Sequence, residues 1–468
     1  MLVRRFYDDR LAQASYLIAC QRSGEAIVID PARDITPYLD AAREEGVRIT
    51  RVTETHIHAD FVSGARELAA RTGATPLLSA EGGPDWQYGW AESDGAELLH
   101  DGDVITLGRV RLEVWHTPGH TPEHLAFVVV DSARSEEPVA MLSGDFLFVG
   151  DVGRPDLLEK AAKVAGTMDA SARQLFASLQ RLASLPDHLQ IWPGHGAGSA
   201  CGKALGAVPT STLGYERRSN WAFSLGDADA FVAAVLEGQP TPPTYFGTMK
   251  RMNRAGPPVL GPQTPLAALP ASALEAALHD SDVVDIRVAA AYREGHVRGT
   301  LNIPLNKSFT TWAGWLLRHD RDIALIAPDA ESAEQARRAL QSIGLDRVRG
   351  AFGLDVVTGA GPRLSTGSTG DILATDRWLA EGRLIVDLRE PNEWDAGHIP
   401  GAQHHPLGTV AATLADVDRS TPIAVHCQSG GRSAIGASVL ERMGFSDVLD
   451  LSGGWTAWEA EAQKAVTS

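Results

Sequence analysis

The stretch Thr55-His56-Ile57-His58-Ala59-Asp60-Phe61 decides the fold of the first part of the chain. It follows the pattern H-x-H-x-D-H, whose closely spaced imidazoles and carboxylates hold a pair of metal ions, except that Phe61 stands where the last histidine belongs. A phenyl ring donates no lone pair, so the second metal position is short of a ligand. The stretch therefore predicts one bound metal ion rather than two.

Three later segments carry the same kinds of side chain in tight turns. They are Thr117-Pro118-Gly119-His120, Leu142-Ser143-Gly144-Asp145 and Trp192-Pro193-Gly194-His195, and each lies beside an apolar, strand-like run. Gly and Pro fix the backbone of such turns, so the direction of the polar side chain is controlled. The ends of strands are also where layered α/β folds place their sites.

Short apolar strands and helix-like segments alternate around these turns. The pattern predicts an α/β fold with mixed sheets flanked by helices. We expect strands at residues 15–19, 26–29, 47–53, 111–115, 125–130 and 139–142, and helices at 35–45 and 64–72.

Taken in chain order, these histidines and aspartates resemble the metallo-β-lactamase superfamily, which implies an αββα sandwich. Within that superfamily the nearer resemblance is to the persulfide dioxygenases, whose single iron is held by two histidines and one aspartate. Carried onto this chain, the metal ligands are His56, His120 and Asp145. Two imidazoles and one carboxylate leave open positions for substrate and dioxygen, as non-haem Fe(II) oxygenases need. A closed zinc site would leave no such room.

The other polar residues of the motif need a different role. We expect His58, Asp60 and His195 to support the ligands or a bound water through hydrogen bonds, with direct ligation as the alternative. His124 precedes a predicted strand and is expected to be structural. Phe61 weakens the binuclear hydrolase interpretation without abolishing it, because a binuclear site can survive on fewer ligands.

Substrate contacts are expected from two later loops. The loop around Arg154 resembles the part of the persulfide dioxygenases that closes over the substrate, so Arg154 could pair with a substrate carboxylate or, alternatively, with Asp156. Cys201 lies in a glycine-rich turn near the expected metal and could relay sulfur to iron, or could be structural. Lys203, two residues farther on, is expected to help bind the substrate.

The chain is too long for a single hydrophobic core, since 468 residues correspond to roughly three domains. The net charge of −17 is spread along the sequence, which argues against nucleic acid or an anionic membrane as a partner. We find no signal-peptide pattern and no run long enough to span a membrane. Three widely spaced cysteines suit a reducing compartment, so we expect a cytoplasmic protein, with Cys20 in the core.

Two stretches rich in Pro, Gly and small polar residues divide the sequence, one between Glu237 and Pro270 and one between Gly359 and Gly370. We therefore expect a first domain at residues 1–240, a linker at 241–269, and two further domains at 270–360 and 370–468.

The last two domains are copies of each other. Val284-Asp285-Ile286-Arg287 recurs 102 residues later as Val386-Asp387-Leu388-Arg389, and Gly295-His296-Val297-Arg298-Gly299 recurs as Gly397-His398-Ile399-Pro400-Gly401. A duplicated α/β domain of about one hundred residues is the simplest account.

The last domain carries the loop Cys427-Gln428-Ser429-Gly430-Gly431-Arg432 between an apolar strand and a helix. Backbone N–H groups and the positive end of a helix favour a thiolate and an anion bound to it. The six-residue loop is one residue shorter than that of cysteine phosphatases and resembles the sulfurtransferase loop of rhodaneses. The resemblance makes Cys427 and Arg432 catalytic residues and places Gly430 and Gly431 against the substrate.

In the middle copy Ala327 stands at the cysteine position and Ser332 at the arginine position. The loop has no nucleophile, and its carboxylates would repel an anion. This domain resembles an inactive rhodanese, retained to pack between its neighbours or to build an oligomer interface. We therefore expect a homo-oligomer.

The order of the three domains resembles the fused persulfide dioxygenase-sulfurtransferases of the CstB type. The resemblance implies that a mononuclear non-haem Fe(II) site oxidises a low-molecular-weight thiol persulfide with O₂ to sulfite, and that the last domain exchanges sulfane sulfur between persulfide, sulfite and thiosulfate. One alternative is a zinc thioester hydrolase similar to glyoxalase II, with the rhodanese-like domains in regulation. Another is that these domains only bind a partner.

Overall fold

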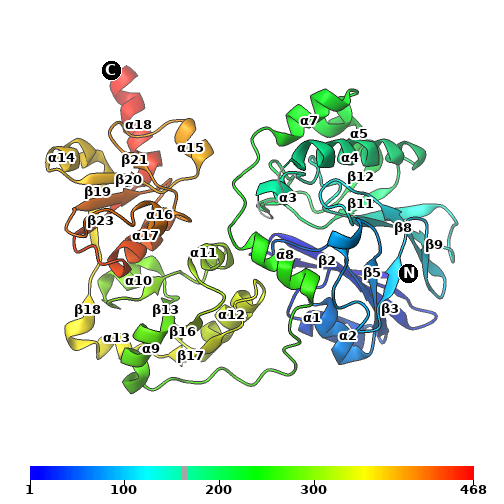
Figure 1. Cartoon of the computed structure of the whole chain (residues 1–468), viewed down its shortest axis with the longest axis horizontal. Helices are drawn as coiled ribbons and strands as arrows, with labels where there is room; N and C mark the ends of the chain where they lie inside the picture. The colour runs from blue at the N-terminus through cyan, green and yellow to red at the C-terminus, as the bar shows by residue number, and fades with distance from the viewer. Residues whose placement is uncertain (161–165, 468) are drawn as a thin grey trace. The chain divides into compact units, whose positions relative to one another are not determined.

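The computed structural model describes residues 1–160 and 166–467 (Figure 1). The chain divides into two compact units, one made of residues 1–263 with 341–344, and the other of residues 264–340 with 345–468. Among the described residues, no helix combines the length and the apolar character needed to cross a membrane.

The first unit contains two six-stranded sheets. In the first sheet β1 to β3 are antiparallel and β3 to β6 run parallel, and in the second sheet β10 and β11 are the parallel pair. The strands of the first sheet, in spatial order, are β1 (Leu2–Asp8), β2 (Gln13–Cys20), β3 (Glu25–Ile29), β4 (Arg48–Thr53), β5 (Thr75–Ser79) and β6 (Glu97–Leu99). Those of the second are β12 (Ser211–Thr212), β11 (Gln190–Pro193), β10 (Pro138–Gly144), β9 (Leu125–Asp131), β8 (Val110–His116) and β7 (Val104–Leu107).

Helices cover the outer faces of both sheets. On β2, Tyr16 and Ile18 pack into a core shared by the two sheets, whereas Leu17 and Ala19 pack outward under helices. Because successive side chains of a strand point to opposite faces, a strand buried on both faces is apolar throughout. The two sheets thus face each other across one core and carry helices on their outer faces, which confirms the predicted αββα sandwich. The helices of this unit are α1 (Thr36–Glu44), α2 (Ala65–Thr72), α3 (Leu157–Lys160), α4 (Met168–Arg181), α5 (Leu213–Ser219), α6 (Trp221–Ser224), α7 (Ala228–Leu236) and α8 (Phe246–Ala255).

The segment expected as a linker contains helix α8, which packs on the first unit. Asn253 donates from Nδ2 to the carbonyl oxygens of His58 (2.8 Å) and Phe61 (2.7 Å), and its Oδ1 accepts the backbone N–H of Ser63 at 3.0 Å. The expectation of a plain linker over residues 241–269 is therefore wrong for this part. The buried face formed by Phe246, Met249 and Asn253 has helical spacing, but prolines on both sides conceal it in the sequence.

The second unit holds two sheets with parallel central strands. The first sheet is β15 (Leu301–Asn302), β13 (Ser281–Asp285), β16 (Asp322–Ile326) and β17 (Val348–Phe352). The second is β19 (Ser368–Asp371), β23 (Val448–Ser452), β22 (Ile423–His426), β20 (Leu384–Asp387) and β21 (Gln403–His404). The polar connection after Gly359 is built into this unit, because β18 (Leu364–Ser365) pairs with β14 (His296–Val297) and β19 pairs with β23.

The helices of the second unit flank these sheets. They are α9 (Leu274–Asp280), α10 (Ala289–Glu294), α11 (Phe309–Leu316), α12 (Ala330–Gln341), α13 (Asp355–Thr358), α14 (Thr375–Ala380), α15 (Pro391–Asp395), α16 (Val410–Thr413), α17 (Gly431–Arg442) and α18 (Gly454–Thr467). The repeated motif makes the same contact in both copies, since Arg287 pairs with Asp285 and Arg389 pairs with Asp387, each at 2.6 Å.

Candidate functional site

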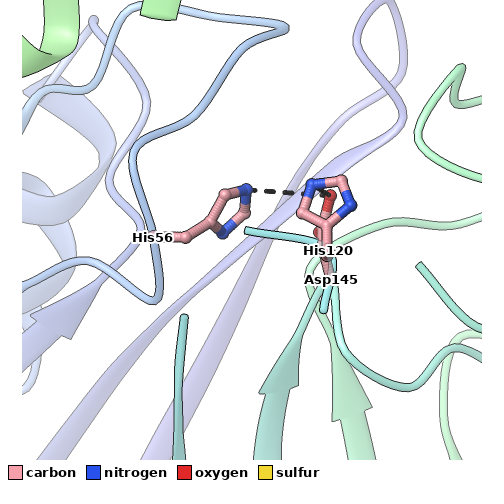
Figure 2. A group of neighbouring side chains, drawn as sticks. All are labelled: His56, His120 and Asp145. Atoms are coloured by element: carbon pink, nitrogen blue, oxygen red, sulfur yellow. Dashed lines mark ion pairs between the residues drawn. The ribbon is translucent and has the colours of Figure 1, made fainter. Parts of the chain in front are cut away.

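His56, His120 and Asp145 meet in the interior of the first unit. They come from the loops after β4, between β8 and β9, and after β10, and their ligand atoms all lie within 4.8 Å of one another. Asp145 Oδ2 is 3.5 Å from His120 Nε2 and 3.9 Å from His56 Nε2. Figure 2 shows the His56 imidazole facing the other two side chains.

Hydrogen bonds behind the two imidazoles turn their Nε2 atoms toward Asp145. His120 Nδ1 donates to the carbonyl oxygen of Arg154 at 3.0 Å. The Thr55 hydroxyl donates to Asp30 at 3.0 Å, so its oxygen accepts from His56 Nδ1 at 2.9 Å. Each Nε2 is then an unprotonated acceptor, which is the form that binds a metal.

The electrostatics of this group favour a bound cation. Burial holds the pKa of His56 well below its usual value and lowers the pKa of His120 to about 3, so both rings are neutral. Burial raises the pKa of Asp145 to about 6. Among the described residues, His56 Nε2 and both Asp145 oxygens have no hydrogen-bond partner. Because buried polar atoms without partners are costly, the donor set fits a divalent metal that would satisfy all three.

His124 positions Asp145 rather than joining the cluster. Its Nε2 accepts the backbone N–H of Asp145 at 3.1 Å, and its Nδ1 lies 2.8 Å from Thr117 Oγ1. Gly144, at a φ of +51°, allows this close approach, since a Cβ there would lie 2.7 Å from His124 Nε2. The structural role expected for His124 agrees with this geometry.

A second group lies next to the first and consists of Asp60, His195 and Cys201, whose ligand atoms also fall within 4.8 Å of one another. His195 Nε2 is 3.3 Å from Asp60 Oδ2 and 3.6 Å from Asp145 Oδ1. Its Nδ1 lies 3.1 Å from the carbonyl oxygen of Ala12. Burial raises the pKa of the Cys201 thiol well above its usual value. The glycine-rich turn thus brings Cys201 to the metal cluster, as the sequence predicts.

His58 packs against the His56 ring, with 4.2 Å between the ring centroids, but its Nε2 is engaged by Asp30. Its Nε2 is 3.0 Å from Asp30 Oδ1, and although burial lowers the pKa of His58, the ion pair with Asp30 outweighs burial and raises it to about 9. Asp30 also accepts the backbone N–H of Thr55 at 2.6 Å. The sequence analysis missed Asp30; the only signal for it is an acid directly after the apolar strand β3.

The structure gives Arg154 and Lys203, the two cations expected to contact the substrate, partners within the protein. The Arg154 side chain is fully buried, its Nε and Nη2 donate to the two Asp156 oxygens at 2.7 Å each, and its Nη1 donates to the carbonyl oxygen of Ala200 at 3.1 Å. The alternative pairing with Asp156 is therefore the observed one, and it is buried. Lys203 Nζ donates to the carbonyl oxygens of Ala234 and Glu237 at the end of α7. Both cations are thus held by partners within their own chain.

In the second unit, Cys427 follows β22 directly and α17 starts four residues later. The backbone N–H of Gly430 points at the Cys427 sulfur from 3.2 Å, and Ser433 Oγ lies 3.8 Å from it. A Cβ added at Gly430 or Gly431 would meet nothing within 4 Å, so the loop has open space around its glycines. This is the space that an anion above the thiol requires.

Arg432 is held beside the loop by a two-point ion pair. Its Nη1 and Nη2 lie 2.6 and 2.7 Å from the two oxygens of Glu393, which also accepts the backbone N–H of Glu390 at 2.9 Å.

The corresponding loop of the middle copy differs. There the Asp329 carboxylate accepts the backbone N–H of Ser332 at 2.7 Å, so a side chain of the loop itself takes up a backbone N–H that an anion would otherwise use.

Two family models match the chain. The metallo-beta-lactamase superfamily model matches residues 8–195, and the rhodanese-like domain model matches residues 270–350 and 373–461. Together the two models account for both folds that the structure contains.

Individual proteins agree with these models. A crystal structure of a metallo-beta-lactamase from Staphylococcus aureus subsp. aureus COL is 42% identical, with a TM-score of 0.68, covering 75% of this chain and 99% of that one. A hydroxyacylglutathione hydrolase of Polaromonas sp. is 35% identical over 42% of this chain and 66% of its own length. The mitochondrial persulfide dioxygenase ETHE1 of Bos taurus is 29% identical over 42% of this chain and 68% of its own length. The chain belongs to the metallo-β-lactamase superfamily and carries, in addition, rhodanese-like domains.

Proposed function

We propose that the chain is a persulfide dioxygenase coupled to a sulfurtransferase. One observation carries the proposal: two histidines and one aspartate, His56, His120 and Asp145, meet in a buried group in which His56 Nε2 and both Asp145 oxygens lack partners among the described residues. The two-histidine, one-carboxylate set is the one expected of non-haem Fe(II) oxygenases. The likeness to a persulfide dioxygenase supports the same substrate class.

When bound, Fe(II) would supply the redox chemistry that couples O₂ reduction to sulfur oxidation. The residues behind the trio position the three ligands. Thr55 Oγ1 and the Arg154 carbonyl oxygen keep the two imidazoles in the tautomer that binds a metal, and His124 fixes the backbone of Asp145. The overall reaction is RSSH + O₂ + H₂O → RSH + SO₃²⁻ + 2 H⁺. The buried site keeps bulk water away from the reacting sulfur.

The thiol loop would perform the second reaction. The Cys427 thiolate attacks the outer sulfur of a second persulfide, the S–S bond breaks, and the carrier leaves as a thiol with its proton. Sulfite then attacks the sulfur held on Cys427, so that thiosulfate leaves and the thiolate is restored. The Gly430 N–H aimed at the sulfur, and the space beside Gly431, suit an anionic sulfur. Arg432 contributes positive charge beside the loop.

We assign Cys201 a role in delivering sulfur to the metal cluster. Its sulfur lies beside Asp60, His195 and the Asp145 carboxylate, where it could take sulfane sulfur from a carrier persulfide, provided that its proton, held by burial and by the nearby carboxylates, passes to the departing carrier thiolate. A Cys201→Ser variant should then lower the rate of O₂ uptake while the iron content stays the same. Unchanged O₂ uptake would leave Cys201 a structural residue.

The test is O₂ consumption by iron-loaded protein given persulfides of glutathione, coenzyme A and other small thiols, with sulfite and thiosulfate measured in parallel. O₂ uptake that yields sulfite in equal amount is expected. No uptake with any persulfide, at full iron content, would overturn the proposal.

A zinc thioester hydrolase is the second candidate. It is favoured by the group of Asp60, His195 and Cys201, which could hold a second metal ion, and by the likeness to hydroxyacylglutathione hydrolases. This candidate requires two metal ions per chain and hydrolysis of S-lactoylglutathione without O₂. Metal analysis and that assay separate it from the dioxygenase.

A further inference from the structure

Helix α8 forms one side of the metal cluster. Asn253 ties the helix to the backbone of His58 and Phe61. At the other end of the helix Tyr245 is buried, and its pKa is raised by burial first and then by the charges of Asp60 and Cys201. The helix therefore follows the cluster along its length, although the sequence around it has the composition of a linker.

Lys250 projects from the middle of this helix. Its Nζ lies 3.5 Å from the centre of the Trp86 ring. It is also close to two groups of the site, since its charge contributes, after burial, to lowering the pKa of His120 and acts against the burial that raises the pKa of Glu123. Burial lowers the pKa of Lys250 itself to about 8, so the ammonium remains mostly charged at pH 7.

This ammonium lacks an acceptor. Among the described residues, none offers Lys250 Nζ an oxygen at hydrogen-bond or ion-pair distance, although an ammonium has three donors. Glu123 is the nearest acidic influence on Lys250, but no hydrogen bond or ion pair joins the two side chains: Glu123 Oε1 accepts the Ile57 N–H at 2.8 Å, and its Oε2 has no hydrogen-bond partner among the described residues. A half-buried cation with free donors beside a catalytic cluster has the chemistry of an anion-binding group.

We propose that Lys250 binds an anionic oxygen group of the thiol carrier, a carboxylate or a phosphate, and so selects anionic persulfides over neutral ones. The inference rests on the proposed function for the identity of the carrier. The Trp86 ring lies against the Lys250 ammonium itself, so the carrier would reach the ammonium from the side that the ring leaves open. Lys250 is in this view a positioning and specificity residue, not one that takes part in sulfur oxidation.

The test measures binding without turnover. Titration calorimetry on metal-free protein would use S-methylglutathione as the carboxylate probe, S-methyl-coenzyme A as the phosphate probe and 2-(methylthio)ethanol as the neutral one. Lys250→Met keeps an unbranched side chain and removes the charge, and should weaken binding of one anionic probe about tenfold, the loss of one charged hydrogen bond. The neutral probe should be unaffected. Lys250→Arg should restore most of the affinity.

Arg251→Met is the matched control, because Arg251 is exposed on the same helix and carries the same charge. The inference is overturned if Lys250→Met binds both anionic probes as the wild type does, or if Arg251→Met weakens them equally. It is also overturned if the wild type prefers neither anionic probe to the neutral one. Oxygen uptake by the wild type tests the proposed function separately, so either idea can fail without the other.

Discussion

Phe61 shows how one residue changes the metal chemistry of the motif. Its ring is buried and packs 4.4 Å from the His58 ring, and His58 is itself turned to Asp30. Phe61 thus offers no donor and His58 is engaged by Asp30, while Asp60, His195 and Cys201 lie together beside the cluster.

Restoring the histidine tests this account. Phe61→His should raise the zinc content of zinc-loaded protein from about one toward two ions per chain, since an added imidazole completes the second ligand set. Metal analysis after gel filtration measures it. Phe61→Leu, which changes the ring but adds no donor, is the control, and an unchanged zinc content in Phe61→His would count against the role assigned to Phe61.

A variant of His120 tests whether O₂ uptake and sulfurtransfer are independent of each other. His120→Ala removes one of three ligands and should lower iron content and O₂ uptake by about 100-fold, while thiosulfate:cyanide sulfurtransfer by Cys427 continues. Both rates are measured on one preparation whose fold is checked by circular dichroism. Loss of sulfurtransfer together with O₂ uptake, in folded protein, would contradict independent sites.

The sequence predicts these ligands because local motifs carry them. His56, His120 and Asp145 each follow a strand in a turn shaped by Gly, Pro or Thr, and the resemblance to persulfide dioxygenases singles them out from the other histidines and acids of the motifs. Asp30, which holds both His58 and Thr55, carries no such signal, because its role depends on strand β3 lying beside β4. The backbone partners of Arg154 and Lys203 carry no signal in the sequence either, because they are fixed by packing that the sequence does not display.

At the scale of elements, the strands were predictable and α8 was not. Strands β2, β4 and β9 are apolar runs bounded by turns, and the predicted ranges lie within two residues of the observed ends. Helix α8 is short and lies between proline-rich segments, so its periodicity is hidden. Its place is fixed by one buried amide, that of Asn253, which satisfies three backbone groups.

Replacing Asn253 should therefore lower protein stability and metal affinity more than replacing an exposed residue of the same helix. Asn253→Ala leaves two carbonyl oxygens and one N–H without partners, at a cost of about 1–3 kcal/mol for each buried group, and should loosen the loop of His58 and Phe61. We expect a lower Tm and a weaker metal affinity, measured by calorimetry and by competition with a chelator. Arg251→Ala, on the exposed face, is the control. An unchanged metal affinity with a lowered Tm would limit α8 to a structural role.

At the scale of the whole chain, the two sites have complementary chemistry. Under the proposed function, sulfite from the first unit is the acceptor that a sulfur-loaded Cys427 needs, and both proposed reactions consume the same carrier persulfide. This relation needs no contact between the units, because sulfite diffuses freely. It also explains why an active and an inactive rhodanese-like copy can occur together: only the loop with Cys427 requires a nucleophile and open glycines.

Cys427→Ser tests that relation. The variant should consume O₂ at the wild-type rate, because the metal cluster is untouched, but sulfite should accumulate and enzymatic thiosulfate should fall by about 100-fold, as when a covalent nucleophile is removed. Initial rates of both products are compared with a protein-free reaction, because sulfite and persulfide also react without catalysis. Cys20→Ser, a buried thiol of the first unit's core, is the control. Thiosulfate formed at the wild-type rate by Cys427→Ser would reduce the rhodanese-like pair to a binding module.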